Sequence, residues 1–294
     1  MLETVVKLNP NFNTHVRKNP LVTSKRCEDT LFKYNIHPSP LPPTTPNRSR
    51  QRYKKNPDPN HKKKHFFWPK KKPFLIHPEK YLKNYQPYDY YLCFDVEATC
   101  ERGKFMEFPN EIIEFPVVLL DGATFRVVDE FHAYVRPTKN PVLSQFCIEL
   151  TGISQCVVDV SPTFEEVLAL FGIWLMERGL FIEYSCAFIT DGPFDIRDFI
   201  EKQCRQSKIL RPIYFWQPWI DIRRMFSEYY GCERKNIPGM LEKLSMKFRG
   251  REHSGIDDAR NIGRIAKKMV DDGCMFTANA SLMTPYFWKR KMCV

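Results

Sequence analysis

The chain has 294 residues, enough for one or two domains, and its 45 Lys and Arg residues outnumber 34 Asp and Glu residues, for a formal net charge of +11. No segment reaches the roughly 18 consecutive apolar residues of a membrane-spanning helix, so we expect no membrane span. The 10 cysteines include no Cys-x-x-Cys pair, which disfavours a disulfide framework or a four-cysteine zinc site and favours reduced thiols in an intracellular protein.

The basic character belongs to the N-terminal segment. Residues 1–86 contain 19 Lys and Arg residues against 5 Asp and Glu residues, are rich in proline and show no persistent helical or strand period, so we expect a disordered basic tail. Within it, Phe66, Phe67 and Trp68 lie between lysines, which suits a nucleic-acid contact through phosphates and base stacking. A nuclear-import signal and a solvated tail with a few aromatic side chains docking on the domain are the alternatives.

Three strands are predicted where the chain turns globular, near residue 88. They cover residues 91–97, 112–120 and 125–135, and Asp121-Gly122 joins the second and third as a hairpin turn. Next come helices at 143–150 and 163–178, a strand at 182–190, and helices at 194–207, 220–230, 239–246 and 255–271. This order predicts an α/β fold with a mixed sheet covered by helices on its faces.

Two carboxylates end the first predicted strand. Because side chains alternate along a strand, Asp95 and Glu97 point to the same face, with Cα atoms roughly 6.6 Å apart. Two like charges this close on a half-buried face repel each other, and a cation between them removes that cost. The pair therefore predicts a divalent metal site.

A further acid follows the strand at 182–190. Asp191 precedes Gly192-Pro193 and suits a helix N-cap, which is the simpler interpretation. It also ends a strand, at the edge of an open α/β sheet where functional sites are built.

The last predicted helix brings an acid and a histidine. Ser254 and Asp257 match a capping box, which gives Asp257 a structural role. Helical phase then places Asp258 on the apolar stripe that should face the sheet, and Asp257 on the face of Asn261, which should meet solvent. An acid on a buried stripe needs a partner, and His253 lies just before the helix, where a loop can direct it to the same place.

These acids and one histidine are sufficient for a two-metal phosphodiesterase. Carboxylates would hold two Mg²⁺ or Mn²⁺ ions about 3.5–4 Å apart beside a phosphate. A neutral histidine within reach of the attacking water would act as general base. The candidates are Asp95, Glu97, Asp191, His253 and Asp258.

Five segments also follow each other in a recognisable order. They are Phe94-Asp-Val-Glu-Ala-Thr-Cys100, Phe108-Pro-Asn-Glu-Ile-Ile-Glu-Phe-Pro116, Leu150-Thr-Gly-Ile153, Thr190-Asp-Gly-Pro-Phe-Asp195 and His253-Ser-Gly-Ile-Asp-Asp258. The chain thereby resembles the DEDDh 3′–5′ exonucleases of the RNase H-like superfamily, and specifically the branch of the histone-mRNA 3′ exonuclease, also called the enhanced-RNAi exonuclease. The resemblance covers residues 88–275 as the exonuclease domain and leaves 276–294 as a C-terminal extension.

The resemblance implies a role for each matching residue. Asp95, Glu97, Asp191 and Asp258 correspond to the metal ligands, with two Mg²⁺ or Mn²⁺ ions as cofactor, and His253 corresponds to the general base, with Glu97 also at the reaction centre. The residues implied to contact the terminal nucleotide, besides Glu97 and His253, are Ala98, Leu150, Thr151, Ile153 and Phe194. Core packing is the alternative for the apolar ones.

The function that this resemblance implies is removal of nucleotides from RNA 3′ ends with release of 5′-monophosphates, in RNA processing or RNA interference. RNA, structured or duplex, would be the partner. A DNA exonuclease of the same fold and a nucleic-acid-binding adaptor driven by the basic tail are the alternatives. Cytoplasm and nucleus both remain open as locations, and protein partners and membranes are not implied.

Overall fold

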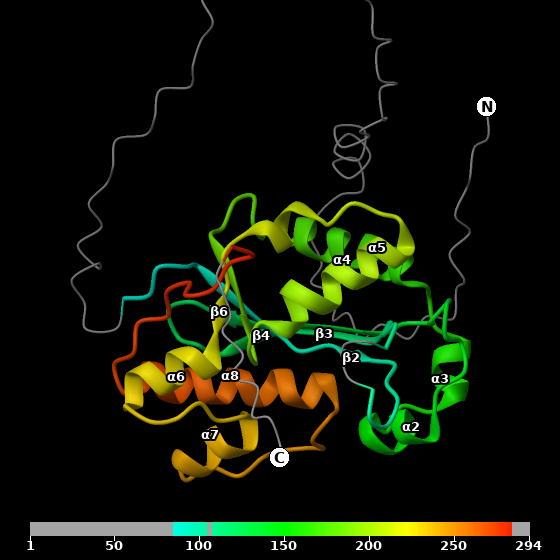
Figure 1. Ribbon diagram of the computed structural model, residues 1–294. Helices are drawn as coiled ribbons and strands as arrows, with labels where there is room; N and C mark the ends of the chain where they lie inside the picture. Colours follow the sequence, from blue (N-terminus) through cyan, green and yellow to red (C-terminus); the bar gives the residue numbers. More distant parts are fainter. Residues whose placement is uncertain (1–84, 105–107, 284–294) are drawn as a thin grey trace, which may run out of the picture. The chain divides into compact units, whose positions relative to one another are not determined.

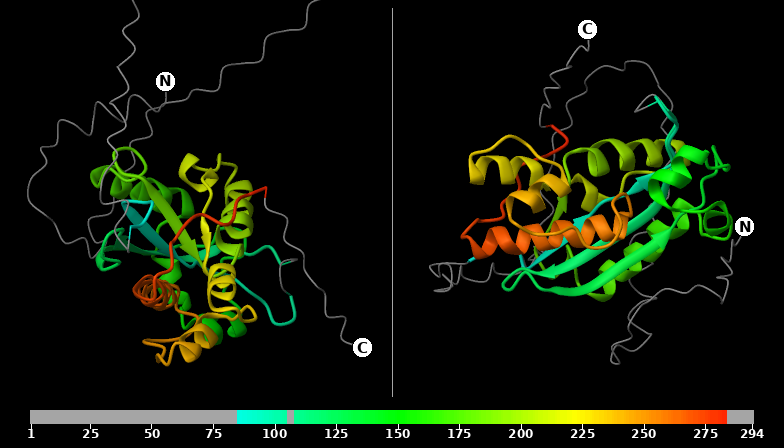
Figure 2. Two further views of the ribbon diagram at one scale, coloured as in Figure 1. Left: turned by 90° about the vertical axis from the view of Figure 1, so that its left-hand side faces the viewer. Right: turned by 90° about the horizontal axis from the view of Figure 1, so that it is seen from below.

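The computed structural model describes residues 85–104 and 108–283. The predictions for the tail up to residue 84 and for residues 284–294 lie outside them. Within the described ranges, a mixed sheet is covered by helices on both faces, as predicted (Figures 1 and 2). No helix of this described part is long and apolar enough to cross a membrane.

The sheet contains six strands in the order β2-β3-β1-β5-β6, with β4 paired to β3. Strand β3 runs antiparallel to β1, β2 and β4, whereas β1, β5 and β6 are parallel to one another. The strands are β1 (Tyr90–Phe94), β2 (Glu97–Ala98), β3 (Ile112–Asp121), β4 (Val127–Tyr134), β5 (Cys186–Thr190) and β6 (Ile220–Asp221).

The helices divide between the two faces of this sheet. Figure 1 shows α4 and α5 on one side and α6, α7 and α8 on the other, with α2 and α3 at one end beside β2. The helices are α2 (Gln145–Thr151), α3 (Gln155–Asp159), α4 (Phe164–Glu177), the π-helical η3 (Asp195–Ile200), α5 (Glu201–Ser207), the 3₁₀ turn η4 (Ile213–Trp216), α6 (Ile222–Tyr230), α7 (Ile237–Lys243) and α8 (Gly255–Asp271).

Alternation along β1 explains why the sheet needs both helical layers. Leu92 and Phe94 belong to the apolar cluster under α4, and Tyr91 and Cys93 belong to the cluster under α8. All four side chains are fully buried. A strand that buries both faces must be sandwiched, and the next residue in the α8-facing series is Asp95.

The observed elements differ from the predicted ones at a few places. The first predicted strand is interrupted after Phe94, because the N–H of Val96 donates to the carboxyl group of Asp195 at 3.0 Å instead of to a neighbouring strand. The predicted helix at 194–207 is divided into η3 and α5. The helix predicted from residue 220 begins two residues later, because Ile220 and Asp221 pair with β5 and Asp221 caps α6. The short elements α3 and η4 were not predicted.

Residues just outside the predicted domain boundaries of 88 and 275 also pack against this domain. The side chain of Gln86 is buried and bonds to the backbone of Cys274 and Phe276. Phe276 is itself fully buried, and Ala280 pairs with Trp219 across an isolated bridge. Residues on both sides of 88–275 thus pack against the domain, Phe276 in the apolar cluster under α8 and Ala280 in the cluster under α4.

Candidate active site

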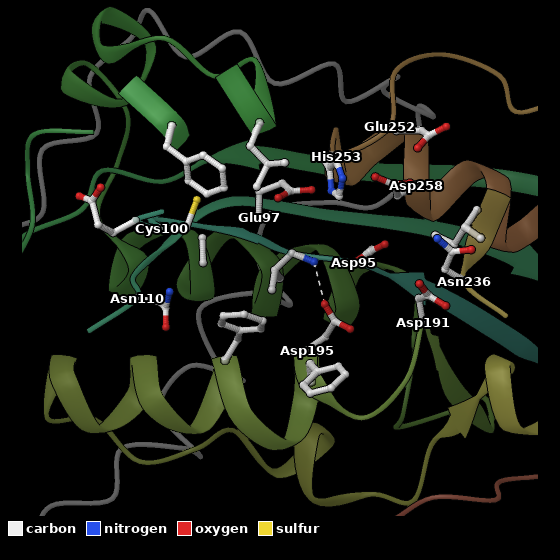
Figure 3. A pocket seen from close by; sticks show the side chains of 18 of the residues that line it. Asp95, Glu97, Cys100, Asn110, Asp191, Asp195, Asn236, Glu252, His253 and Asp258 are labelled. Atoms are coloured by element: carbon white, nitrogen blue, oxygen red, sulfur yellow. Dashed lines mark hydrogen bonds between the residues drawn. The ribbon is translucent and has the colours of Figure 1, made fainter. Parts of the chain in front are cut away.

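A cleft of about 790 Å³ opens where β1 ends, between α2, η3, α6 and the start of α8 (Figure 3). Acids dominate the charged residues of its lining, with only Lys104, Arg223 and His253 as basic residues among the described lining residues. The acids are Asp95, Glu97, Glu101, Asp191, Asp195, Glu252 and Asp258.

The predicted pair at the end of the first strand does share this cleft. Asp95 continues the alternation of β1, and Glu97 lies directly opposite Glu114 of β3. Burial, followed by the charges of Asp195 and Asp258, raises the pKa of Asp95 well above its ordinary value. Burial and the charge of Glu114 do the same for Glu97. Both groups are thus costly to ionise unless a cation joins them.

Asp195 is a site residue that the sequence interpretation missed. It is buried at the start of η3 and accepts the N–H of Val96 at 3.0 Å, and its charge raises the pKa of the neighbouring Asp95. Burial raises its pKa to about 7. The sequence does contain a signal for this residue, because Asp195 lies one turn beyond Asp191 and directly after Phe194. A helix that starts there directs its first residues back to the strand end.

Asp191 lines the same cleft, but its carboxylate is already paired with the guanidinium group of an arginine. Arg223 of α6 donates Nε to one carboxylate oxygen of Asp191 at 2.6 Å and Nη2 to the other. Burial still raises the pKa of Asp191 in spite of this partner. The helix begins at Asp195, so Asp191 is not its N-cap either. Asp195 is therefore the acid beside Asp95, and we propose it in place of Asp191 as the third acidic ligand, a role that the sequence predicts for Asp191.

Asp258 and His253 lie where the sequence predicts them, at the start of α8. Asp258 is buried, and burial followed by the charge of Asp191 raises its pKa to about 7. His253 has a left-handed backbone with φ of 62°, which directs the exposed imidazole into the cleft beside Glu97 and Asp258 (Figure 3). Asp257 bonds instead to Arg251 and Arg260.

One prediction about α8 is wrong in detail. Asn261 is fully buried and binds the backbone of Arg249 and Asp257, so it does not meet solvent, whereas Asp257 and Lys268 on the same face are partly exposed. The loop that leads into His253 covers Asn261.

The residues present fit divalent cations. Asp95, Glu97, Asp195 and Asp258 supply only carboxylate oxygens, the donors that Mg²⁺ and Mn²⁺ prefer. Among the described residues, no three His, Cys, Asp or Glu side chains are already drawn together as a closed metal cage. An open row of carboxylates agrees with Mg²⁺ binding through a few carboxylates, waters and substrate phosphates. Without cations, so acidic a cleft would repel a phosphodiester.

Apolar side chains form the walls beside these acids. Phe146 and Leu150 of α2 line one part of the cleft, and Phe194 and Phe199 at η3 line another. Ala98 also lines it, and its carbonyl accepts the thiol of Cys147. Leu150, Phe194 and Ala98 were predicted as nucleotide contacts, whereas Phe146 and Phe199 were not.

Thr151 and Ile153 are not among the residues that line the cleft, and their contact with a nucleotide stays a prediction. Both are buried, and the hydroxyl of Thr151 donates to the carbonyl of Cys147 and accepts the N–H of Ile153. The reason is helical phase, because Phe146 and Leu150 share one face of α2 while Cys147 and Thr151 share the buried one.

Comparison with known proteins identifies the family. The family model described as Exonuclease matches residues 92–266. The chain is 42% identical over 215 residues to human 3'-5' exoribonuclease 1, covering 72% of this chain and 61% of that protein. It is 41% identical over 210 residues to 3'-5' exonuclease eri1 of Schizosaccharomyces pombe, covering 65% and 71%. The chain thus spans about three fifths of the human relative and more of the yeast one.

Solved structures agree with the sequence relatives. The nuclease domain of 3'hExo, a DEDDh family member bound to rAMP, is 44% identical with a TM-score of 0.64, covering 66% of this chain and 98% of that one. A 3'-exonuclease that recognises the 3' end of a histone mRNA stem-loop is 42% identical with a TM-score of 0.65, covering 67% and 68%. This family implies dependence on a divalent metal. The chain belongs to the exonuclease family and, within it, to the DEDDh branch that these relatives represent.

Proposed function

We propose that this protein is a metal-dependent 3′–5′ exoribonuclease that removes nucleotides one at a time from RNA 3′ ends and releases 5′-monophosphates. The observation that carries the proposal is the meeting of Asp95, Glu97, Asp195, Asp258 and His253 in one cleft. Asp95 directly follows β1, Glu97 belongs to β2 and Asp195 to η3, while His253 precedes α8 and Asp258 lies in its first turn. Their convergence is therefore a product of the tertiary fold.

Two Mg²⁺ or Mn²⁺ ions, when bound, would activate a water and stabilise the leaving 3′ oxygen. The four carboxylates would hold them, and their raised pKa values describe the cost of assembling that negative charge without the ions. His253 would accept the proton of the attacking water. Its side chain lies in the same cleft as Asp258, so this base is next to a proposed ligand (Figure 3).

The walls of the cleft support binding of a strand end. Phe146 and Leu150 on one side and Phe194 and Phe199 on the other offer apolar surfaces on which a terminal base could stack. The relatives bound to rAMP and to a histone mRNA stem-loop support RNA as the substrate class. We further propose an intracellular location, which the unpaired thiols of the 8 described cysteines favour.

The test is a digestion assay on matched RNA and DNA oligonucleotides with free or blocked 3′ ends, with Mg²⁺, Mn²⁺ or EDTA. We expect stepwise shortening of RNA from its free 3′ end, arrest by EDTA and inactivity of Asp195→Asn. Preferential shortening of DNA would replace the proposal with a DNA exonuclease. RNA binding without shortening, unchanged in Asp95→Ala, would favour an adaptor.

A further inference from the structure

Glu114 is a buried acid outside the cleft that touches several parts of the site. It lies on β3 with a relative exposure of 1%, and it is the cross-strand partner of Glu97 on β2. Directly opposite residues of antiparallel strands project to the same face of the sheet. Glu114 therefore lies beside Glu97, one of the proposed metal ligands, although it does not line the described cleft itself.

The carboxyl group of Glu114 binds the first turn of α8. One oxygen accepts the N–H of Gly255 at 2.9 Å, and the other accepts the N–H of Ile256 at 3.2 Å. The second oxygen also bonds to Nε2 of His132 on β4, at 2.8 Å. Glu114 thus joins two neighbouring strands to the helix that carries Asp258.

This contact takes the place of the cap that the sequence predicts. Ser254 occupies the N-cap position of α8, but its side chain makes no capping hydrogen bond among the described residues. The first N–H groups of a helix have no partner within it, and a negative charge there also offsets the helix dipole. A glutamate 141 residues away in the chain supplies both functions.

The close approach at Gly255 makes the position of this helix start critical. A Cβ atom added to Gly255 would lie 2.5 Å from the carbonyl oxygen of Asp95 and 3.3 Å from a carboxyl oxygen of Glu114. The helix start is therefore pressed against the end of β1. Any shift of the first turn would move His253 and Asp258 relative to Asp95.

We propose that Glu114 is a positioning residue for the reaction, which holds the start of α8 so that His253 and Asp258 meet the carboxylates of Asp95 and Glu97. This inference rests on the proposed function. Glu114 acts through the helix and does not contact substrate. His132 on the neighbouring strand β4 supports Glu114 by restraining its carboxyl group.

The test compares Glu114→Gln with a matched control, Glu111→Gln. Glu111 is equally buried at 1% and also accepts backbone N–H groups, but from residues 138–140 rather than from α8. For each variant, kcat, KM, melting temperature and the Mn²⁺ concentration for half-maximal thermal stabilisation are measured. The half-maximal Mn²⁺ concentration reports on the metal site independently of catalytic turnover.

Loss of a partner that orients ligands typically reduces activity or metal affinity about 10–100-fold. For Glu114→Gln we expect kcat to fall about 10–100-fold and KM to stay nearly unchanged. The Mn²⁺ concentration for half-maximal stabilisation should rise by a similar factor. Glu111→Gln should lower the melting temperature with kcat and Mn²⁺ response intact. Wild-type kcat and Mn²⁺ response in Glu114→Gln, or equal losses in both variants, would overturn the inference.

A second variant covers failure of Glu114→Gln to fold. His132→Ala removes a 32%-exposed side chain and should fold, with a smaller loss in kcat and in Mn²⁺ response of the same kind. If kcat and the Mn²⁺ response of His132→Ala both equalled those of the wild-type protein, the inference would be overturned. If the wild-type protein shortens no nucleic acid at all, the proposed function fails, whereas the comparison of Mn²⁺ responses still decides whether Glu114 positions Asp258.

Discussion

Asp191 is held at both carboxylate oxygens by the guanidinium group of Arg223, whereas Asp195, four residues later, lies beside Asp95 and raises the pKa of that carboxyl group by its charge. The two acids follow the same strand and line the same cleft, yet they have opposite electrostatic surroundings. One is neutralised by the chain itself, and the other adds to a cluster of like charges.

The Asn substitutions of these two acids should therefore have opposite effects. Asp195→Asn should reduce kcat about 1000-fold or more, because the metal contribution is worth several kcal/mol, and should raise the melting temperature in EDTA at pH 8 by removing a repelled charge. Asp191→Asn should cost about 1–3 kcal/mol of unfolding free energy, because Arg223 loses a charge partner, with a far smaller loss in kcat. The measurements are steady-state kinetics and thermal unfolding. A larger kcat loss for Asp191→Asn would restore it as the ligand.

His253→Asn should lower kcat about 100- to 10,000-fold, the usual contribution of a general base, and leave KM nearly unchanged. Asparagine is chosen because it tolerates the left-handed conformation that His253 adopts, so the loop should keep its path. Single-turnover digestion of RNA measures the chemical step. An unchanged Mn²⁺-dependent thermal shift is the control, and a fully active variant would remove His253 from the mechanism.

Without metal, the protein should lose stability as the pH rises. Burial raises the pKa of Asp195 and of Asp258 from 3.8 to about 7, so the folded state binds more protons than the unfolded state between these values. The contribution of these two protonated acids to the free energy of unfolding is fully present below pH 4 and is lost as the pH rises through 7. Mn²⁺ binds the ionised carboxylates and should reduce or reverse that slope. Melting temperatures from pH 5 to 8 with EDTA or Mn²⁺ measure it, and equal slopes in both would contradict a metal site built from these acids.

Phe146→Ala should raise KM for an RNA oligonucleotide, because stacking of a base on an aromatic side chain is worth about 1–3 kcal/mol. Thr151→Val on the same helix is the matched control. It removes the buried hydrogen bond to Cys147 and should lower the unfolding free energy by about 1 kcal/mol with unchanged KM. An effect of Thr151→Val on KM equal to that of Phe146→Ala would place the nucleotide elsewhere.

Much of the site follows from local periodicity, and that part was predictable from the sequence. The two-residue period of a strand brings Asp95 and Glu97 to one cleft, and the helical period of residues 255–271 buries Asp258 with the apolar stripe of α8. The extent of α8 was also predicted correctly, because its stripe runs without interruption.

Contacts between distant segments decided the rest. Asp191 and Asp195 look equally suitable in the sequence, and only the approach of Arg223 from α6 separates them. Likewise Ser254 has the sequence of a cap, but Glu114 makes the capping bonds because β3 runs beneath the helix start. Periodicity determines the face on which a side chain lies, whereas its partner depends on which elements the tertiary fold packs against that face.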